Sequence, residues 1–221
     1  TLEVSRPKLK ELKAKARAWY KDADRRRFLQ LLEEILNPEQ DGGWKVNILM
    51  DEWGTQARAH LETLTPDLLE RGQAVLIYAT SAKGSKPAQK WLEGAKTPLD
   101  ALGEADFMRL MNDWLNFFCR TSSKGPTYLL GVYQAGSLLE EENTDLLRAL
   151  IWLSSTVKSE FLASSLANAA LAAFRKIPGY GPRSPKVGTA CVWALENMDG
   201  LHAAAQLERI RLGVKQPQYQ K

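Results

Sequence analysis

The stretches TDLLRALIWLSSTV (residues 144–157) and PKVGTACVWALEN (residues 185–197) decide the fold, because the second echoes the first after 41 positions. The echo continues into the segments that follow each stretch. The residues that match at this shift include Ala149 and Ala190, Trp152 and Trp193, Ala163 and Ala204, and Leu166 and Leu207.

Each copy of the echo has the periodicity of two helices. We expect the first pair at about 144–157 and 160–176, and the second at about 185–197 and 201–214. Small alanines at matched positions let helices approach closely, while the matched Trp and Leu side chains fill the space between layers. A period near 40 with paired helices is typical of HEAT or armadillo repeats. The prediction is an all-α fold, a HEAT/armadillo-like right-handed stack of helical hairpins (an α-solenoid).

The rest of the chain also has helical periodicity. Apolar residues predict helices after Pro7, over 28–36, over 44–63 with Gly54 weakening its middle, and along 107–118. Three cap-then-proline signals mark further helix starts: Thr65-Pro66, Thr97-Pro98 and Ser184-Pro185. The conformation of residues 121–136 stays open between a short strand, a packed loop and part of a helix.

These elements suggest one helical-repeat domain over 1–221, with basic N-terminal helices (1–40), middle helices (44–140) and two related helix pairs (143–215). The chain starts without Met and ends without an evident cap, which is expected of a fragment of a longer protein. Its composition, 44% hydrophobic and 25% charged, is that of a globular protein and excludes wholesale disorder. No apolar run approaches the roughly 20 residues that cross a bilayer, so no membrane partner is expected.

Charge is unevenly distributed along the chain. Lys and Arg outnumber Asp and Glu by 10 to 4 in residues 1–27 and by 8 to 3 in 175–221, but are outnumbered 12 to 19 between them. The basic residues at the two ends can either bind a polyanion or simply keep the helix surfaces solvated. The modest net charge of +4 favours the second alternative. The candidate residues for contacts with a nucleic-acid backbone are Arg183, Lys186, Arg209, Arg211 and Lys215.

The segment IPGYGP (residues 177–182) allows two interpretations. A Pro-Gly-apolar-Gly turn resembles the phosphate-binding element of helix-hairpin-helix proteins. The alternative is a structural turn between repeats, and Pro185 favours it by delaying the next helix and removing an N–H donor. The residues of this turn are Pro178, Gly179, Gly181, Pro182 and Pro185.

The sequence contains no recognisable catalytic pattern. His60 and His202 are the only histidines, and Cys119 and Cys191 lie 72 positions apart among apolar neighbours. A four-ligand zinc site or a disulfide framework is therefore not expected, and no phosphate loop or nucleophile elbow appears. We expect no cofactor, no metal and no enzymatic activity.

A family resemblance rests on four stretches: KIPGYGPRSPKVGTACVWAL (176–195), AKGSKPAQKWL (82–92), NTDLLRALIWL (143–153) and AQLERIRLGVK (205–215). They resemble the helical region of large bacterial proteins described as molybdate-metabolism-regulator-like (MolR-like). The resemblance covers roughly residues 75–215. It implies a helical scaffold inside a longer, cytoplasmic bacterial protein, and it supplies no catalytic residues. The Trp-Gly-Arg module that many of these proteins carry is absent from this chain.

The predicted function is therefore a non-catalytic scaffold or protein-interaction module that binds a protein partner. The first alternative is nucleic-acid binding through the basic residues near the C-terminus. A second alternative, a helical-repeat DNA-repair enzyme, would require an acidic residue in a cleft lined by aromatic side chains.

Overall fold

The structure, a computed structural model, describes residues 45–121, 127–129, 132–134, 138–157 and 159–214. The chain divides into two units between Trp44 and Lys45, and the described residues belong to the second unit. The two helices expected within 1–40 lie outside the described residues, as does Lys215.

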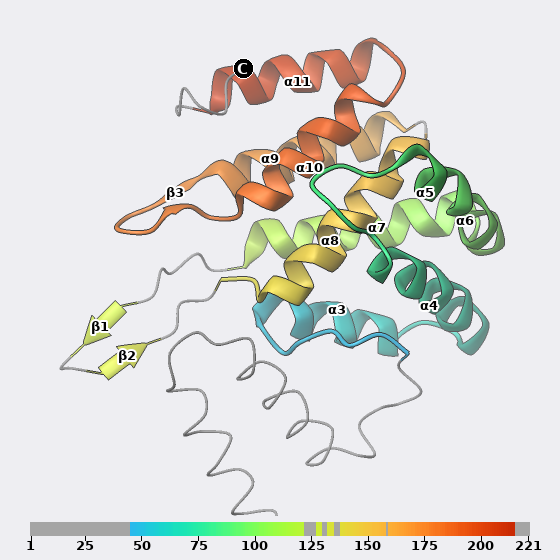
Figure 1. The fold of residues 1–221 in the computed structure, drawn as a ribbon, viewed down its shortest axis with the longest axis horizontal. Helices are drawn as coiled ribbons and strands as arrows, with labels where there is room; N and C mark the ends of the chain where they lie inside the picture. Colours follow the sequence, from blue (N-terminus) through green and yellow to red (C-terminus); the bar gives the residue numbers. More distant parts are fainter. Residues whose placement is uncertain (1–44, 122–126, 130–131, 135–137, 158, 215–221) are drawn as a thin grey trace, which may run out of the picture. The chain divides into compact units, whose positions relative to one another are not determined.

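The described part is mostly helical, which confirms the all-α prediction (Figure 1). Its α-helices are α3 (Glu52–Glu62), α4 (Pro66–Thr80), α5 (Gln89–Gly94), α6 (Lys96–Leu102), α7 (Glu104–Arg120), α8 (Glu141–Leu153), α9 (Glu160–Phe174), α10 (Pro185–Glu196) and α11 (Leu201–Gly213), and a short 3-10 helix, η1 (Ser154–Thr156), follows α8. No helix among the described residues has both the length and the apolar character needed to cross a membrane.

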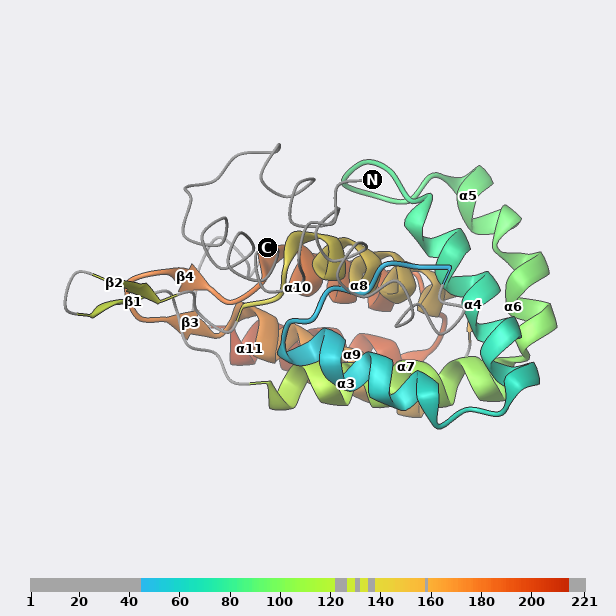
Figure 2. The same cartoon turned by 90° about the horizontal axis from the view of Figure 1, so that it is seen from below.

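The longer helices pack in two layers. In one layer α8 packs against α4 and α10, and in the other α7 packs against α3 and α9 while α9 packs against α11. Helix α10 also packs closely on α9 and joins the layers (Figure 2). Helices α8 to α11 coincide closely with the two predicted helix pairs, because amphipathic periodicity and the Pro185 start signal fix these elements locally.

The core lies between the layers. The predicted apolar stripe of α7 is buried throughout: Phe107, Leu110, Met111, Trp114, Leu115 and Phe118. Trp53 of α3 meets Trp114 edge to face at 5.4 Å, and its indole Nε1 donates a hydrogen bond to the Trp114 carbonyl at 3.0 Å. Buried alanines allow α9 to lie close to its neighbours, and the matched Ala149 and Ala190 are both buried.

The third predicted helix begins later than Trp44. Helix α3 starts at Glu52, where the Asp51 side chain caps it by accepting a hydrogen bond from the Gly54 N–H at 2.6 Å. Residues before Asp51 do not continue the helix, because Leu49 pairs with the buried amide of Asn143: its N–H donates to Asn143 Oδ1 and its carbonyl accepts from Asn143 Nδ2. A methyl group at Gly54 would overlap the Leu49 carbonyl oxygen, so glycine there permits the close approach.

Two of the three helix starts predicted from cap-then-proline signals agree with the structure, and one does not. Thr65 caps α4 by accepting from the Leu68 N–H, as predicted. Pro185 is the first residue of α10, although Ser184 makes no side-chain cap hydrogen bond. The Thr97-Pro98 prediction is wrong, because α6 already starts at Lys96, directly after α5. There the proline occupies the first turn of a helix that runs on from its predecessor, and a first-turn proline loses no intrahelical hydrogen bond.

Short antiparallel strands complete the described elements. Within the region left open by the sequence, β1 (Thr127–Leu129) pairs with β2 (Val132–Gln134), so the strand interpretation holds for these residues. After α9, β3 (Lys176–Ile177) pairs with β4 (Gly181–Pro182). Gly179 and Gly181 have φ of 75° and 114°, which only glycine adopts readily. The IPGYGP segment is thus a hairpin turn, in agreement with its structural interpretation.

Candidate functional site

An open cleft of about 550 Å³ lies between α5 and α6 on one side and η1, Val157 and the C-terminal part of α10 on the other. Helix α7 supplies the remaining wall. Most of the polar side chains that line the cleft are exposed, so the cleft is accessible from solvent. The lining residues are Gln89, Leu92, Glu93, Lys96, Leu99, Asp100, Glu104, Phe107, Ser155, Thr156, Val157, Trp193 and Asn197.

Carboxylates dominate the charge of the cleft. Among the described residues of the lining, Glu93, Asp100 and Glu104 are acidic and Lys96 is the one cation. Gln89 Nε2 donates a hydrogen bond to Glu93 Oε1 at 3.1 Å. Within the described part of the chain, Asp100 and Glu104 take part in no ion pair or hydrogen bond of their side chains. Their charge is therefore available to a ligand.

Trp193 forms an apolar wall of the cleft. Its side chain is half-buried, whereas the matched Trp152 is 1% exposed. The prediction that both indoles fill the space between layers is wrong for Trp193. The physical reason is that other side chains cover Trp152. Trp91 of α5 meets the Trp152 ring edge to face, with 6.3 Å between ring centroids, and the Arg148 guanidinium lies 4.8 Å from the centroid of the Trp152 ring. Trp193 instead opens into the cleft.

The other matched positions also differ between the copies. Ala163 and Leu166 of α9 are buried, but Ala204 is exposed and Leu207 is half-buried. Helix α11 packs mainly on α9 and α10 among the described elements, so one of its faces lacks a helical neighbour there. A matched side chain is buried where another helix packs over it and exposed where none does. Identical residues in the two copies do not determine which of the two occurs.

Helix α4 holds α5 against the cleft. The Tyr78 hydroxyl donates a hydrogen bond to the Trp91 carbonyl at 2.5 Å, and the two rings stack at 5.5 Å. The Trp91 indole in turn donates to Ser81 Oγ at 3.0 Å. A side chain at Gly94 would collide with the Tyr78 hydroxyl, so glycine lets α5 approach α4.

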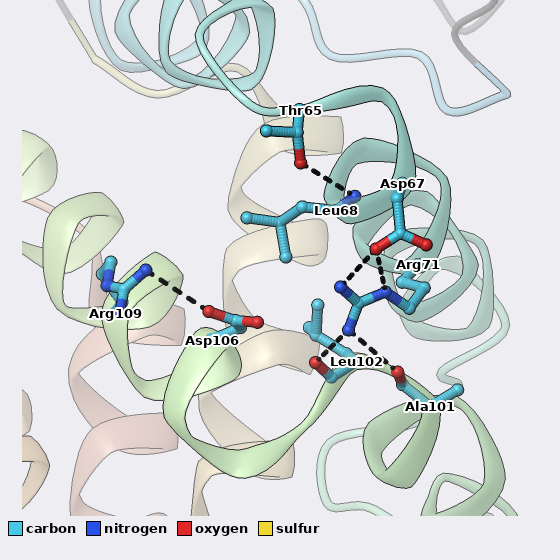
Figure 3. Close-up of polar contacts among 8 residues, drawn as sticks. All are labelled: Thr65, Asp67, Leu68, Arg71, Ala101, Leu102, Asp106 and Arg109. Atoms are coloured by element: carbon cyan, nitrogen blue, oxygen red, sulfur yellow. Dashed lines mark hydrogen bonds and ion pairs between the residues drawn. The ribbon is translucent and has the colours of Figure 1, made fainter.

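Helix α4 also anchors the C-terminal end of α6 (Figure 3). One guanidinium nitrogen of Arg71 donates to the carbonyls of Ala101 and Leu102, at 3.2 and 2.9 Å. Asp67, one turn earlier, holds the same guanidinium through its Nε and Nη2. A cation at the last carbonyls of a helix satisfies orphan acceptors and favours the helix dipole. The result is a fixed position for α6, which carries Lys96, Leu99 and Asp100 into the cleft.

The predicted basic residues occupy different environments. Arg183 is 4% exposed; its guanidinium lies 4.1 Å from the Phe118 ring centroid and donates to Thr121 Oγ1. Burial lowers the pKa of Arg183 to about 10, with nearby Arg175 adding to the decrease. The group stays charged at neutral pH, but its burial keeps it from an external phosphate.

The exposed basic residues are engaged by neighbours on the protein. Lys186 Nζ forms ion pairs with Asp145 at 3.0 Å and Glu141 at 3.2 Å, and these contacts raise the pKa of Lys186 against the opposing effect of partial burial. Arg209 donates to Asn168 Oδ1 at 2.7 Å, and Arg211 makes a two-pronged contact with Glu208. The structure therefore does not gather these residues into one set of unengaged cations.

His60, Cys119 and Cys191 have structural surroundings, whereas His202 Nε2 lies 3.1 Å from the hydroxyl oxygen of Ser164. Trp114 Nε1 donates to His60 Nδ1 at 3.2 Å, and His60 Nε2 lies 3.6 Å from Asp113. Both His60 ring nitrogens thus have partners, and neither partner is a hydroxyl or a thiol. Burial raises the pKa of Cys119, although nearby arginines oppose the shift, and raises that of Cys191 well above its usual value. Raised thiol pKa values disfavour the reactive thiolate.

Sequence reasoning missed the cleft residues Glu93, Asp100, Glu104 and Trp193. The three carboxylates come from three helices, so no local spacing joins them. One signal was present: at the 41-residue shift, Arg148 corresponds to Thr189, so the two indoles have different neighbours one helical turn away.

In comparisons with known proteins, no protein-family model, curated protein or solved structure matches the chain.

Proposed function

We propose that this chain is a HEAT-like helical-repeat module that binds a peptide segment of a protein partner in the cleft beside Trp193. It acts as a non-catalytic scaffold. On the sequence resemblance alone, we place it within a longer, cytoplasmic bacterial protein of the MolR-like class.

Contacts between positions 41 residues apart support the repeat stack. Lys186 of α10 pairs with Asp145 of α8, and Arg209 of α11 hydrogen-bonds Asn168 of α9. In a stack of repeats, equivalent positions of successive units lie side by side, so the same separation is expected in both layers. The helix packing, α8 on α10 and α9 on α11, agrees with this arrangement.

The cleft itself is the observation that carries the binding function. It joins an accessible indole and aliphatic side chains to carboxylates, hydroxyls and amides on one continuous surface. Tryptophan in a partly open pocket is characteristic of sites where a few side chains dominate binding energy. Two of the helices that line it, α5 and α6, are fixed by α4, so a ligand meets a preformed surface there.

Selection of short random peptides against the whole chain tests this function. We expect enriched peptides whose affinity falls at least about tenfold in Trp193→Ala, since truncating a central tryptophan costs about 2 kcal/mol or more. Tyr180→Ala is the matched control, because Tyr180 is 53% exposed on the β3–β4 hairpin outside the cleft. Failure to enrich any peptide, or enrichment indifferent to Trp193→Ala, would refute the proposal.

The structure favours neither alternative function. Arg183 is buried, while Lys186, Arg209 and Arg211 already have partners, so these residues offer little to a phosphate backbone. The cleft does combine carboxylates with an indole, as a DNA-repair enzyme would require. However, its carboxylates outnumber its lining cation and would repel phosphates.

A further inference from the structure

The protein contains its own example of how an indole at this position is covered. Arg148 lies one helical turn before Trp152 and places its guanidinium 4.8 Å from the ring centroid. Asp145, three residues before Arg148, forms an ion pair with that guanidinium, with 3.3 Å between Asp145 Oδ1 and Arg148 Nη2. A carboxylate, a guanidinium and an indole thus form one stacked group on α8, and cation–π contact favours this geometry.

The second copy retains the indole and lacks the other two members. At the 41-residue shift, Arg148 becomes Thr189 and Asp145 becomes Lys186. The Thr189 hydroxyl turns back to its own helix and donates to the Pro185 carbonyl at 2.8 Å. Trp193 is left half-buried, without the guanidinium that covers its counterpart.

Carboxylates from other helices line the cleft beside Trp193, although the second copy lacks a counterpart of Asp145. Glu93, Asp100 and Glu104 line the same cleft as Trp193, and the last two have no side-chain partner within the described residues. The lining therefore has the charge and the aromatic surface that a cation needs, but not the cation in position over the indole.

We infer that the cleft receives an arginine side chain of the partner peptide, whose guanidinium covers Trp193 and pairs with the cleft carboxylates. Arginine is the better fit than lysine, because a planar guanidinium stacks on a ring and offers paired donors to a carboxylate, whereas an ammonium is a strongly hydrated point charge. This inference rests on the proposed peptide-binding function and specifies the chemistry of its ligand.

The probe is the acetylated, amidated tripeptide Leu-Arg-Leu, compared with the same peptide containing citrulline or lysine. Citrulline keeps the shape of arginine and removes its charge. Binding to the whole chain is followed through the indole N–H resonance of Trp193, which Trp193→Phe assigns. We expect the arginine probe to shift this resonance and to bind at least about tenfold more tightly than the citrulline probe.

Charge variants separate the cleft from general electrostatics. The triple variant Glu93→Gln, Asp100→Asn, Glu104→Gln should weaken the arginine probe at least about tenfold. The matched control, Glu62→Gln, Glu70→Gln, Glu160→Gln, changes the net charge equally with exposed carboxylates outside the lining, and should leave the affinity within about twofold.

A gain-of-side-chain variant tests the same idea without removing any cleft group. Thr189→Arg restores the residue that covers the matched indole, so the new guanidinium should compete with the probe and reduce its affinity. Equal binding of the arginine and citrulline probes, or no effect of Thr189→Arg, would overturn the inference. Selected peptides that need Trp193 but lack arginine would overturn it as well, while leaving the proposed function intact. If no peptide is selected, both the inference and the proposed peptide-binding function are overturned.

Discussion

Two helix-interior glycines illustrate how one residue type has opposite roles. In Gly54→Ala the new methyl group overlaps the Leu49 carbonyl, so the backbone must shift. In Gly72→Ala the nearest atom is Leu110 Cδ1 at 4.0 Å, an ordinary contact. We expect Gly54→Ala to lower the free energy of unfolding by about 2–3 kcal/mol and Gly72→Ala to raise it by about 0.5–1 kcal/mol. Urea denaturation measures both variants, and an unchanged or raised free energy of unfolding in Gly54→Ala would contradict the close approach at Leu49.

Arg183 carries a buried charge with few partners. Its Nε and Nη1 atoms are buried with no hydrogen-bond partner among the described residues, and Thr121 Oγ1 retains a bond to the Phe118 carbonyl without it. Because burying a charge costs free energy, Arg183→Met should keep the free energy of unfolding or raise it by about 1 kcal/mol. Urea denaturation checks this. A loss above about 1 kcal/mol would indicate that contact with Phe118 outweighs the cost of burial.

At the scale of elements, α4 positions the short helices of the cleft. Helices α5 and α6 have six and seven residues, too short to be stable alone. Tyr78 and Arg71 of α4 supply the contacts that fix them. The cleft geometry therefore depends on a helix that contributes no residue to its lining.

Removing the Arg71 anchor should loosen α6. Arg71→Ala leaves the Ala101 and Leu102 carbonyls without this donor, and we expect the free energy of unfolding to fall by about 1–2 kcal/mol. Asp67→Ala should cost less than about 0.5 kcal/mol, because the Asp67 side chain is 78% exposed. Hydrogen exchange of the α6 amides should accelerate in Arg71→Ala. Unchanged exchange there would show that packing alone fixes α6.

For the unit as a whole, stability should decrease toward α11. Only Ala203 and Ile210 are buried within α11, whereas nine residues of α9 are buried, and Leu201 and Leu212 are 91% and 69% exposed. A helix with few buried residues opens at a lower free energy than a well-buried one. Native-state hydrogen exchange should show α11 amides opening at a lower free energy than those of α9. Equal opening free energies would mean that the unit unfolds all at once.

Local sequence signals determined most of the helical elements. The apolar stripe of α7, the Thr65 cap and the Pro185 start were readable because each depends on residues within a turn or two of one another. Two local predictions failed where distant groups intervened: Asn143 pairs with Leu49 and delays α3, and α5 continues almost directly into α6 at Thr97-Pro98.

The amino-acid sequence by itself determined an all-α chain with two related helix pairs, since periodicity and the 41-residue echo are properties of the order of residues. Only the tertiary structure decided that Arg183 is buried, that Trp193 opens into a cleft, and that Glu93, Asp100 and Glu104 meet beside it. The reason is that the burial of a side chain and the shape of a cleft depend on atoms from other elements of the fold as well as on near neighbours. Trp152 and Trp193 occupy matched positions, but only Trp152 is covered, by Trp91 of another helix and by Arg148, whose matched residue is Thr189.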